Sequence, residues 1–252
     1  MLNLFKPRQG AWRTPGGDIY TLFDTMSKET HLLIAGSTGS GKSCVSAGIM
    51  HSLLTQHSPA ECKFVLIDPK MTELGNYRDL PHTLIYAYEH ADIVSALQKT
   101  VSIMEERLHQ MQARREKLYT GPAIYVIIDE LADIMITLKR QCKPLLQRIL
   151  QLARAAAIHV IACTQVTLSS CIPTEIKINF PGIVALKVPT KQHSRNMIDQ
   201  TGCELFPDPA IEHKALCYYK HGCQCELWKV PYVSDSDIEP LCKWWTSKQC
   251  IA

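Results

Sequence analysis

One short segment of this chain has the residue types that hold the phosphates of a nucleotide. Residues 36–43 match the pattern G-x-x-x-x-G-K-[ST] at every fixed position, with an apolar run before them and a helical pattern after them. In such a loop the glycines let the backbone curl, so that N–H groups and the helix N-terminus face the phosphates. The lysine then reaches the β- and γ-phosphates, and the last hydroxyl ligates Mg²⁺. The sequence therefore predicts an ATP site, with Ser43 on the metal, built from Gly36, Ser37, Thr38, Gly39, Ser40, Gly41, Lys42 and Ser43.

A second segment places two carboxylates at the end of an apolar run. Residues 123–128 are apolar, and Asp129 and Glu130 follow them directly. Open α/β sheets bind ligands at the carboxyl ends of their strands, where Asp129 would hold Mg²⁺. Glu130 would polarise the attacking water as a general base. An acidic pair also suits a helix N-terminus, but the phosphate loop upstream favours catalysis. The adjacent glutamate favours ATP hydrolysis over a kinase, because no acceptor site is visible.

A third polar residue, Gln165, follows the apolar run 159–164. In multimeric ATPases with this type of loop, a polar residue in this place can sense the γ-phosphate and couple it to a neighbouring loop. We therefore predict that Gln165 joins Lys42 and Glu130 as a catalytic residue.

These residues need a sheet whose strands end at one edge, and the hydrophobic pattern predicts one. Strand-like runs alternate with helical patterns from residue 31 to about 200, which is typical of an α/β fold with a mainly parallel central sheet flanked by helices. His221 and Gly222 separate two further runs, which predicts a C-terminal β-hairpin, and residues 235–245 predict a closing helix. The expected strands are 31–35, 63–67, 83–87, 124–128, 160–163 and 183–188, and the expected helices are 42–56, 91–117, 144–157 and 192–200.

The composition excludes several classes of protein. Charged residues make up 20% and hydrophobic residues 46%, as in an ordinary folded protein. No apolar run approaches the roughly 18 residues of a membrane span, and residues 1–13 have no signal-peptide pattern. We therefore expect a cytoplasmic protein without a membrane span.

The chain has 11 cysteines, six of them after residue 200. A metal site could be drawn from Cys217, Cys223 and Cys225 with His213 or His221. No Cys-x2-Cys pair occurs, however, and the cysteines of a Cys-x-Cys pair on one strand point to the same face. Buried or idle thiols are therefore the favoured interpretation.

The net charge of +3 does not by itself indicate a nucleic-acid partner, but the charge is unevenly distributed. Residues 134–174 contain no Asp or Glu. A solvated helix face is the ordinary interpretation of such a run. Its basic residues are Lys139, Arg140, Lys143, Arg148 and Arg154.

Several motifs together resemble the motor domain of the FtsK/SpoIIIE DNA translocases. They are residues 31–43, 66–70 with 73–74, 129–133, 153–159, 162–165 and 194–200, and the similarity extends from about residue 17 to 241. The segment Asp68-Pro69-Lys70 is shared by few families with this phosphate loop. The resemblance implies a RecA-like fold, a hexameric ring and ATP-driven movement on double-stranded DNA. It divides the chain into an N-terminal extension, 1–16, and an ATPase domain, 17–252.

The resemblance also assigns roles to basic residues. Arg154 matches the arginine that acts as a finger on the ATP of the neighbouring subunit, and its ordinary alternative is a surface arginine. Lys191 lies in a loop ascribed to DNA contact. We expect Lys139, Arg140 and Lys143 to contact DNA as well. An arginine of the other DNA-facing loop is absent, because residues 164–167 read Thr-Gln-Val-Thr.

Parts that usually accompany this motor are not found: the N-terminal membrane region, the domain before the motor and a winged-helix module after it. This favours a compact motor of a mobile element or phage, with a relaxase or integrase as a possible partner. One alternative is a related ring ATPase that exports single-stranded DNA or protein. Another is a slow nucleotide-binding scaffold, against which Lys42, Asp129 and Glu130 argue.

Overall fold

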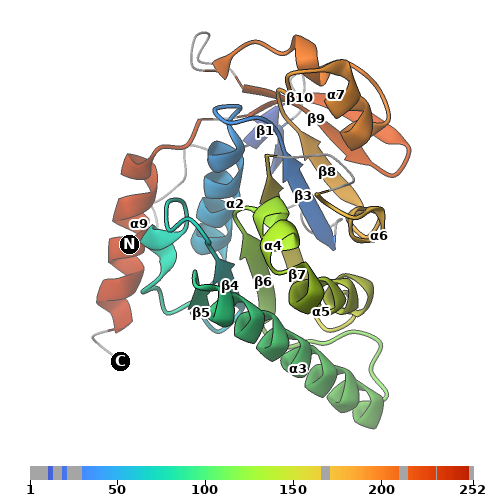
Figure 1. Cartoon of the computed structure of the whole chain (residues 1–252). Coiled ribbons are helices and arrows are strands. Elements are labelled where there is room, and N and C mark those ends of the chain that lie inside the picture. The colour runs from blue at the N-terminus through green and yellow to red at the C-terminus, as the bar shows by residue number, and fades with distance from the viewer. Residues whose placement is uncertain are drawn as a thin grey trace.

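The computed structural model describes residues 11–13, 19–21, 30–165, 171–209, 215–230 and 232–249. The described strands form one ten-stranded sheet in the order β2-β1-β10-β9-β8-β3-β7-β6-β4-β5 (Figure 1). The strands are β1 (Ala11–Arg13), β2 (Ile19–Thr21), β3 (His31–Ala35), β4 (Cys62–Ile67), β5 (Thr83–Ala87), β6 (Ala123–Ile128), β7 (Ile158–Thr164), β8 (Gly182–Ala185), β9 (Ala215–His221) and β10 (Gln224–Val230). The helices are α2 (Lys42–Gln56), α3 (His90–Arg114), α4 (Leu131–Thr137), α5 (Lys139–Leu152), α6 (Thr174–Lys177), α7 (Lys191–Ile198) and α9 (Asp235–Gln249), with short 3₁₀ turns η1 (Gly75–Tyr77) and η2 (Cys203–Leu205).

Six neighbouring strands, β8 to β5 in the sheet order, are all parallel. Parallel strands need both faces covered, and their sequences are accordingly apolar on both faces. In β3 all five residues are buried: Leu33 and Ala35 belong to the core on one face, and Leu32 and Ile34 to the core on the other. The hairpin β9–β10 and then β1 and β2 extend the sheet with antiparallel pairs.

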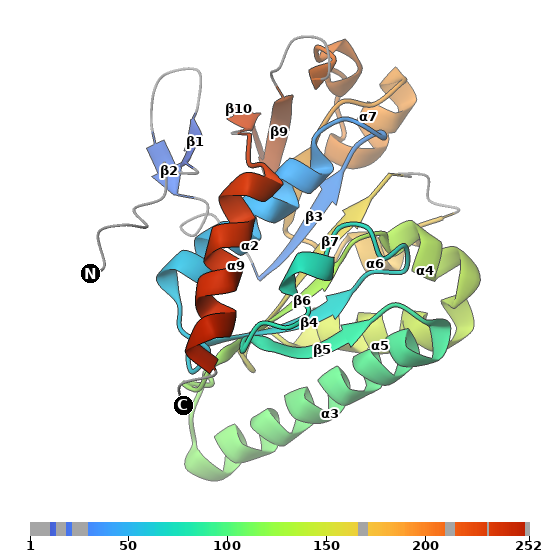
Figure 2. The same ribbon diagram turned by 90° about the vertical axis from the view of Figure 1, so that its left-hand side faces the viewer.

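Helices cover the two faces in separate groups. Helix α2 packs with α9 on one face, and α3, α4 and α5 pack together on the other (Figures 1 and 2). The closing helix α9 is tied to α2 because the indole Nε1 of Trp245 donates to the carbonyl of Leu54 at 2.9 Å. No helix in the described parts of the chain is long and apolar enough to cross a bilayer.

The strand order determines which loops meet. Strands β3, β7, β6 and β4 are neighbours and parallel, so the residues that follow them lie at one edge of the sheet. These residues include Gly36, Gln165, Asp129 and Asp68. We call this edge the nucleotide edge and the opposite one, where the same strands begin, the far edge.

The predicted fold is confirmed, with differences at element ends. The helix expected at 144–157 begins at Lys139 and ends at Leu152, and α4 precedes it. Residues 153–157 form a turn instead, in which Ala157 has φ 52°, a left-handed conformation that a helix does not continue through. The expected strand 183–188 ends at Ala185, and β1 and β2 were not predicted.

Candidate active site at the nucleotide edge

The loop between β3 and α2 is anchored on both sides. The amide of Gly36 donates to the carbonyl of Thr164 on β7 at 3.2 Å, and the amide of Ser37 donates to the carbonyl of Lys187 at 2.9 Å. Gly39 and Gly41 have φ of 74° and 100°, which side-chain-bearing residues rarely adopt. A Cβ added to Gly36 would lie 2.4 Å from Ser40 Oγ, so glycine is needed there for close packing. The loop therefore has the curled backbone that the sequence predicted.

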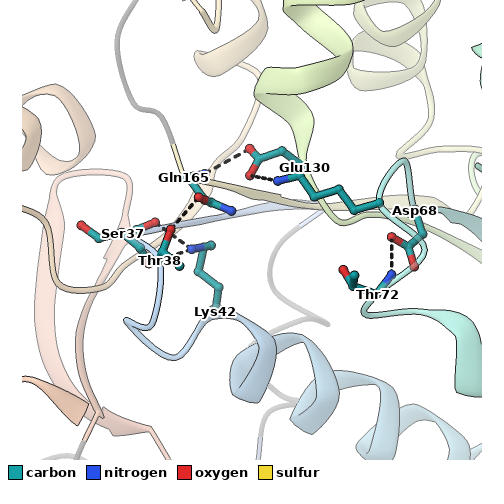
Figure 3. A network of polar contacts seen from close by, with 9 residues as sticks. Ser37, Thr38, Lys42, Asp68, Thr72, Glu130 and Gln165 are labelled. Carbon is teal, nitrogen blue, oxygen red and sulfur yellow. Dashed lines mark hydrogen bonds and ion pairs between the residues drawn. The ribbon is translucent and has the colours of Figure 1, made fainter. Parts of the chain in front are cut away.

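Two polar groups of this loop fit a bound phosphate. The Lys42 ammonium donates to the carbonyls of Gly36 at 2.9 Å and Ser37 at 2.8 Å, so it lies across the loop rather than out in solvent (Figure 3). Burial lowers the pKa of Lys42. The hydroxyl of Ser40 is buried and has no hydrogen-bond partner among the described residues. An anion between these groups would supply the missing partners, as phosphate oxygens do in loops of this type.

A chain of polar contacts links the loop to the neighbouring strand ends. Thr38 Oγ1 donates to Gln165 Oε1 at 2.8 Å, and the backbone amide of Gln165 donates to Glu130 Oε1 at 3.1 Å (Figure 3). The other oxygen of Glu130 lies 3.6 Å from Lys70 Nζ. The structure thus brings Lys42, Glu130 and Gln165 to one place, as the sequence predicted for catalytic residues.

The nucleotide edge carries an excess of carboxylates. Burial raises the pKa of Asp129 to about 7, and the negative charges of Glu73, Asp68 and Glu130 add to the shift. A divalent cation would relieve this repulsion. Among the described residues no group of three or more His, Cys, Asp or Glu side chains could hold a metal by itself. Mg²⁺ typically takes one or two protein ligands together with phosphate oxygens and water, so Ser43 and Asp129 fit such a site.

Arg154 lies away from this edge. It is exposed and follows α5 just before β7 begins, which places it at the far edge. The seven residues of β7 span about 20 Å at roughly 3.3 Å per residue. Arg154 therefore does not join the other catalytic candidates within its own chain.

A buried arginine, which the sequence analysis did not single out, supports the Arg154 turn. Arg107 on α3 donates to the carbonyls of Ala156 at 2.8 Å and Pro122 at 2.9 Å, and its guanidinium lies 4.2 Å from the ring centre of Tyr119. In the turn with the left-handed Ala157, the Arg107 guanidinium thus supplies the hydrogen-bond donor for the Ala156 carbonyl. An arginine among the apolar positions of the long helix was the signal for this role.

The candidate DNA contacts are spread out and partly neutralised. Lys139 and Arg140 are exposed at the start of α5. Lys143 forms an ion pair with Glu175, and Arg148 forms one with Glu105 at 3.1 Å. The acid-free stretch therefore receives carboxylates from outside it. Lys191 is exposed at the first residue of α7, and Val166 and Thr167 of the other loop lie outside the described residues.

The cysteines of the described part of the chain are all free thiols. Burial raises the pKa of Cys217 and of Cys225. His213, which the sequence analysis also considered, lies outside the described residues.

Sequence and structure comparisons with known proteins point to one family and one fold. The model of the FtsK/SpoIIIE family matches residues 12–117 and 108–169. A DNA translocase FtsK of Staphylococcus epidermidis is 39% identical over 220 residues, which cover 79% of this chain and 27% of the relative. A DNA translocase FtsK of Rickettsia bellii is 32% identical over 263 residues, covering 87% of this chain and 35% of the relative. The chain thus spans about a quarter to a third of the length of these relatives.

Two solved structures share the fold. The pCW3 conjugation coupling protein TcpA, in a monomer form with ATPγS, has a TM-score of 0.78 at 21% identity, over 95% of this chain and 71% of that one. The cytoplasmic domain of the Thermomonospora curvata type VII secretion ATPase EccC has a TM-score of 0.75 at 18% identity, over 96% and 32% of the two chains.

Proposed function

Because this chain belongs to the FtsK/SpoIIIE family of ATPases, we propose that it hydrolyses ATP at the nucleotide edge and uses the energy to move double-stranded DNA through a ring of its own copies. The observation that carries the proposal is the contact chain from Thr38 through Gln165 to Glu130. It holds a 6%-exposed carboxylate next to a phosphate-binding loop, where a general base for hydrolysis has to lie.

Four residues of the nucleotide edge have a proposed role in this reaction. Lys42 leaves the carbonyls of Gly36 and Ser37 and neutralises the β- and γ-phosphates. Ser43 and Asp129 would hold Mg²⁺, which supplies positive charge to the phosphate oxygens. Glu130 accepts a proton from water as the water oxygen bonds to the γ-phosphorus. The bond from that phosphorus to the β,γ-bridging oxygen breaks, and ADP leaves with the electron pair.

The position of Arg154 supports the proposed ring. Because it lies at the far edge, about the length of β7 from its own phosphate loop, it can assist hydrolysis only at another subunit. We propose that the exposed Arg154 enters the site of a neighbouring subunit in a hexamer. There it would stabilise charge on the transferred phosphoryl group.

The cargo is proposed from the relatives. Those at 39% and 32% identity are named DNA translocases, which favours double-stranded DNA. The conjugation coupling and secretion proteins share only the fold at this level of identity, so export of single-stranded DNA or protein is the second candidate. The proposal also includes a cytoplasmic location and a role in a mobile element or phage. A relaxase or integrase is the proposed partner.

Two measurements test this function. Glu130→Gln should bind ATP as tightly as the wild type and lose hydrolysis by about 10²- to 10⁴-fold, the usual contribution of a general base. Glu89→Gln, a matched change at an exposed position before α3, should leave turnover unchanged. Duplex DNA should stimulate the wild-type ATPase more than single strands. Wild-type turnover in Glu130→Gln would refute the base, and stimulation by single strands alone would select the export alternative.

A further inference from the structure

Lys70 contacts the proposed general base and has no role in the mechanism above. Its Nζ lies 3.6 Å from Glu130 Oε2, while Glu130 Oε1 accepts the backbone amide of Gln165 at 3.1 Å. The two oxygens of one carboxylate thus face donors from two loops, one after β4 and one after β7. The carboxylate is buried, whereas the Lys70 side chain is 45% exposed. Glu130 is therefore held from both sides, and one of the two holders is a surface lysine.

The loop that carries Lys70 is built around a buried carboxylate. Asp68 is fully buried and accepts the backbone amides of Glu73 at 3.2 Å and Leu74 at 3.0 Å, with a longer contact of 3.4 Å to the amide of Thr72 (Figure 3). Met71, between them, has φ 55°. This folds residues 68–74 into a closed turn, so the backbone of Lys70 is fixed even though its side chain reaches the surface.

The charges of the nucleotide edge show why Glu130 needs such a partner. Asp129 is adjacent to it in sequence, and Asp68 and Glu73 come from the closed turn that follows the neighbouring strand β4. These carboxylates repel one another, and like charges favour side-chain conformations that separate them. Among the described residues, the cation that pairs directly with Glu130 is Lys70, whereas Lys42 donates to carbonyls of its own loop.

We propose that Lys70 is a positioning residue for hydrolysis: it holds Glu130 in the one orientation that also satisfies the Gln165 amide. This rests on the proposed role of Glu130 as the base. Lys70 itself is not needed for nucleotide binding, because the phosphate loop holds the phosphates.

Single substitutions give the first test. Lys70→Ala should lower kcat by about 10- to 100-fold, the cost of a misplaced catalytic group, and change the KM for ATP less than twofold. Lys70→Arg, which keeps a cation of similar reach, should recover most of the loss. Lys99→Ala, at an exposed lysine of α3, is the matched control and should be neutral. Thermal stability should not change, since a partly exposed ion pair contributes little.

A double substitution and a spectroscopic readout test whether Lys70 acts through Glu130. If it does, Lys70→Ala should cost nothing further in a Glu130→Gln background, because coupled residues are not additive. In nucleotide-free protein, Lys70→Ala should shift the NMR resonance of the Gln165 amide, since its acceptor becomes free to move. An unchanged kcat, a fully additive loss or an unmoved Gln165 amide would overturn the inference. Wild-type turnover in Glu130→Gln would instead refute the proposed base, so the two failures are distinguishable.

Discussion

The two edges of the parallel sheet are organised in different ways. At the nucleotide edge, residues from four neighbouring strand ends contact one another in series, from Thr38 to Lys70. At the far edge, Arg154 stands exposed on a turn that Arg107 supports from behind through backbone carbonyls. The first is an assembled centre, and the second presents a single group on a rigid base. In the proposed function, the first edge binds the nucleotide and the second acts on the site of a neighbouring subunit.

The largest expected effect breaks the nucleotide edge itself. Lys42→Ala removes the charge that neutralises the β- and γ-phosphates, so ATP hydrolysis should fall by on the order of 10³ or more. Steady-state ATPase measurements check this, and circular dichroism should show an intact fold. Appreciable turnover in this variant would show that the loop does not hold the reacting phosphates.

The second effect tests the far edge. Arg154→Ala should bind ATP normally and hydrolyse it on the order of 10³-fold more slowly, because the change leaves its own loop intact. Mixing it with Lys42→Ala subunits should restore part of the activity, since each variant supplies what the other lacks. Demonstrated subunit exchange without recovery would mean that Arg154 does not act between subunits or that all sites must fire together. Full activity of Arg154→Ala would make Arg195, exposed on α7, the next candidate.

A third, smaller effect concerns folding stability at the far edge, which should depend on pH through His31. Burial and the neighbouring His159 lower the pKa of His31 to about 3, so it is neutral in the folded state near pH 5, whereas the unfolded chain takes up a proton below about 6.5. Stability should therefore decrease as the pH falls from 6.5 towards 3, by about 2 kcal/mol at pH 5. Urea titrations check this. His31→Asn, which can still accept the amide of Val160, should show a flatter dependence, and an equal slope would exclude His31 as the cause.

The smallest effect concerns DNA. Replacing Lys139, Arg140 and Lys143 together by alanine should weaken duplex binding roughly 10-fold, equally across sequences and with a smaller salt dependence. The Lys139/Arg140 pair should account for most of this, because Lys143 is already paired with Glu175. Lys191→Ala should act in the same direction. Lys243→Ala with Lys248→Ala, on the distant helix α9, is the control. A strong sequence preference, or no change, would remove α5 from the interface.

The difference between the edges also explains what could be predicted from the sequence. The family and the α/β fold are confirmed. They were predictable because the phosphate loop and the 129–130 pair are each short segments that directly follow their own strand. Lys70 and Arg107 received no predicted role. Lys70 meets Glu130 across 60 positions only because β4 and β6 pair, and Arg107 reaches the carbonyl of Ala156, 49 positions away. Such contacts depend on register and burial, which local patterns do not encode.

The same limit applies to charge. The basic stretch 134–174 appears uniform in sequence, yet Glu105 and Glu175 come from outside it and pair with Arg148 and Lys143. Net charge along a chain therefore overestimated the charge available to a partner on this helix. The roles of the individual site residues stay predictions.

The burial of the central strands has a consequence for local opening. Residues of β3 and β7 lie between two separate cores, so we expect their amides to be among the slowest to exchange with solvent. In β10, only Trp228 and Val230 are buried, so we expect the amides of this strand to exchange faster through local fraying. The phosphate loop follows β3 directly, so it is attached to the part of the molecule that we expect to exchange most slowly.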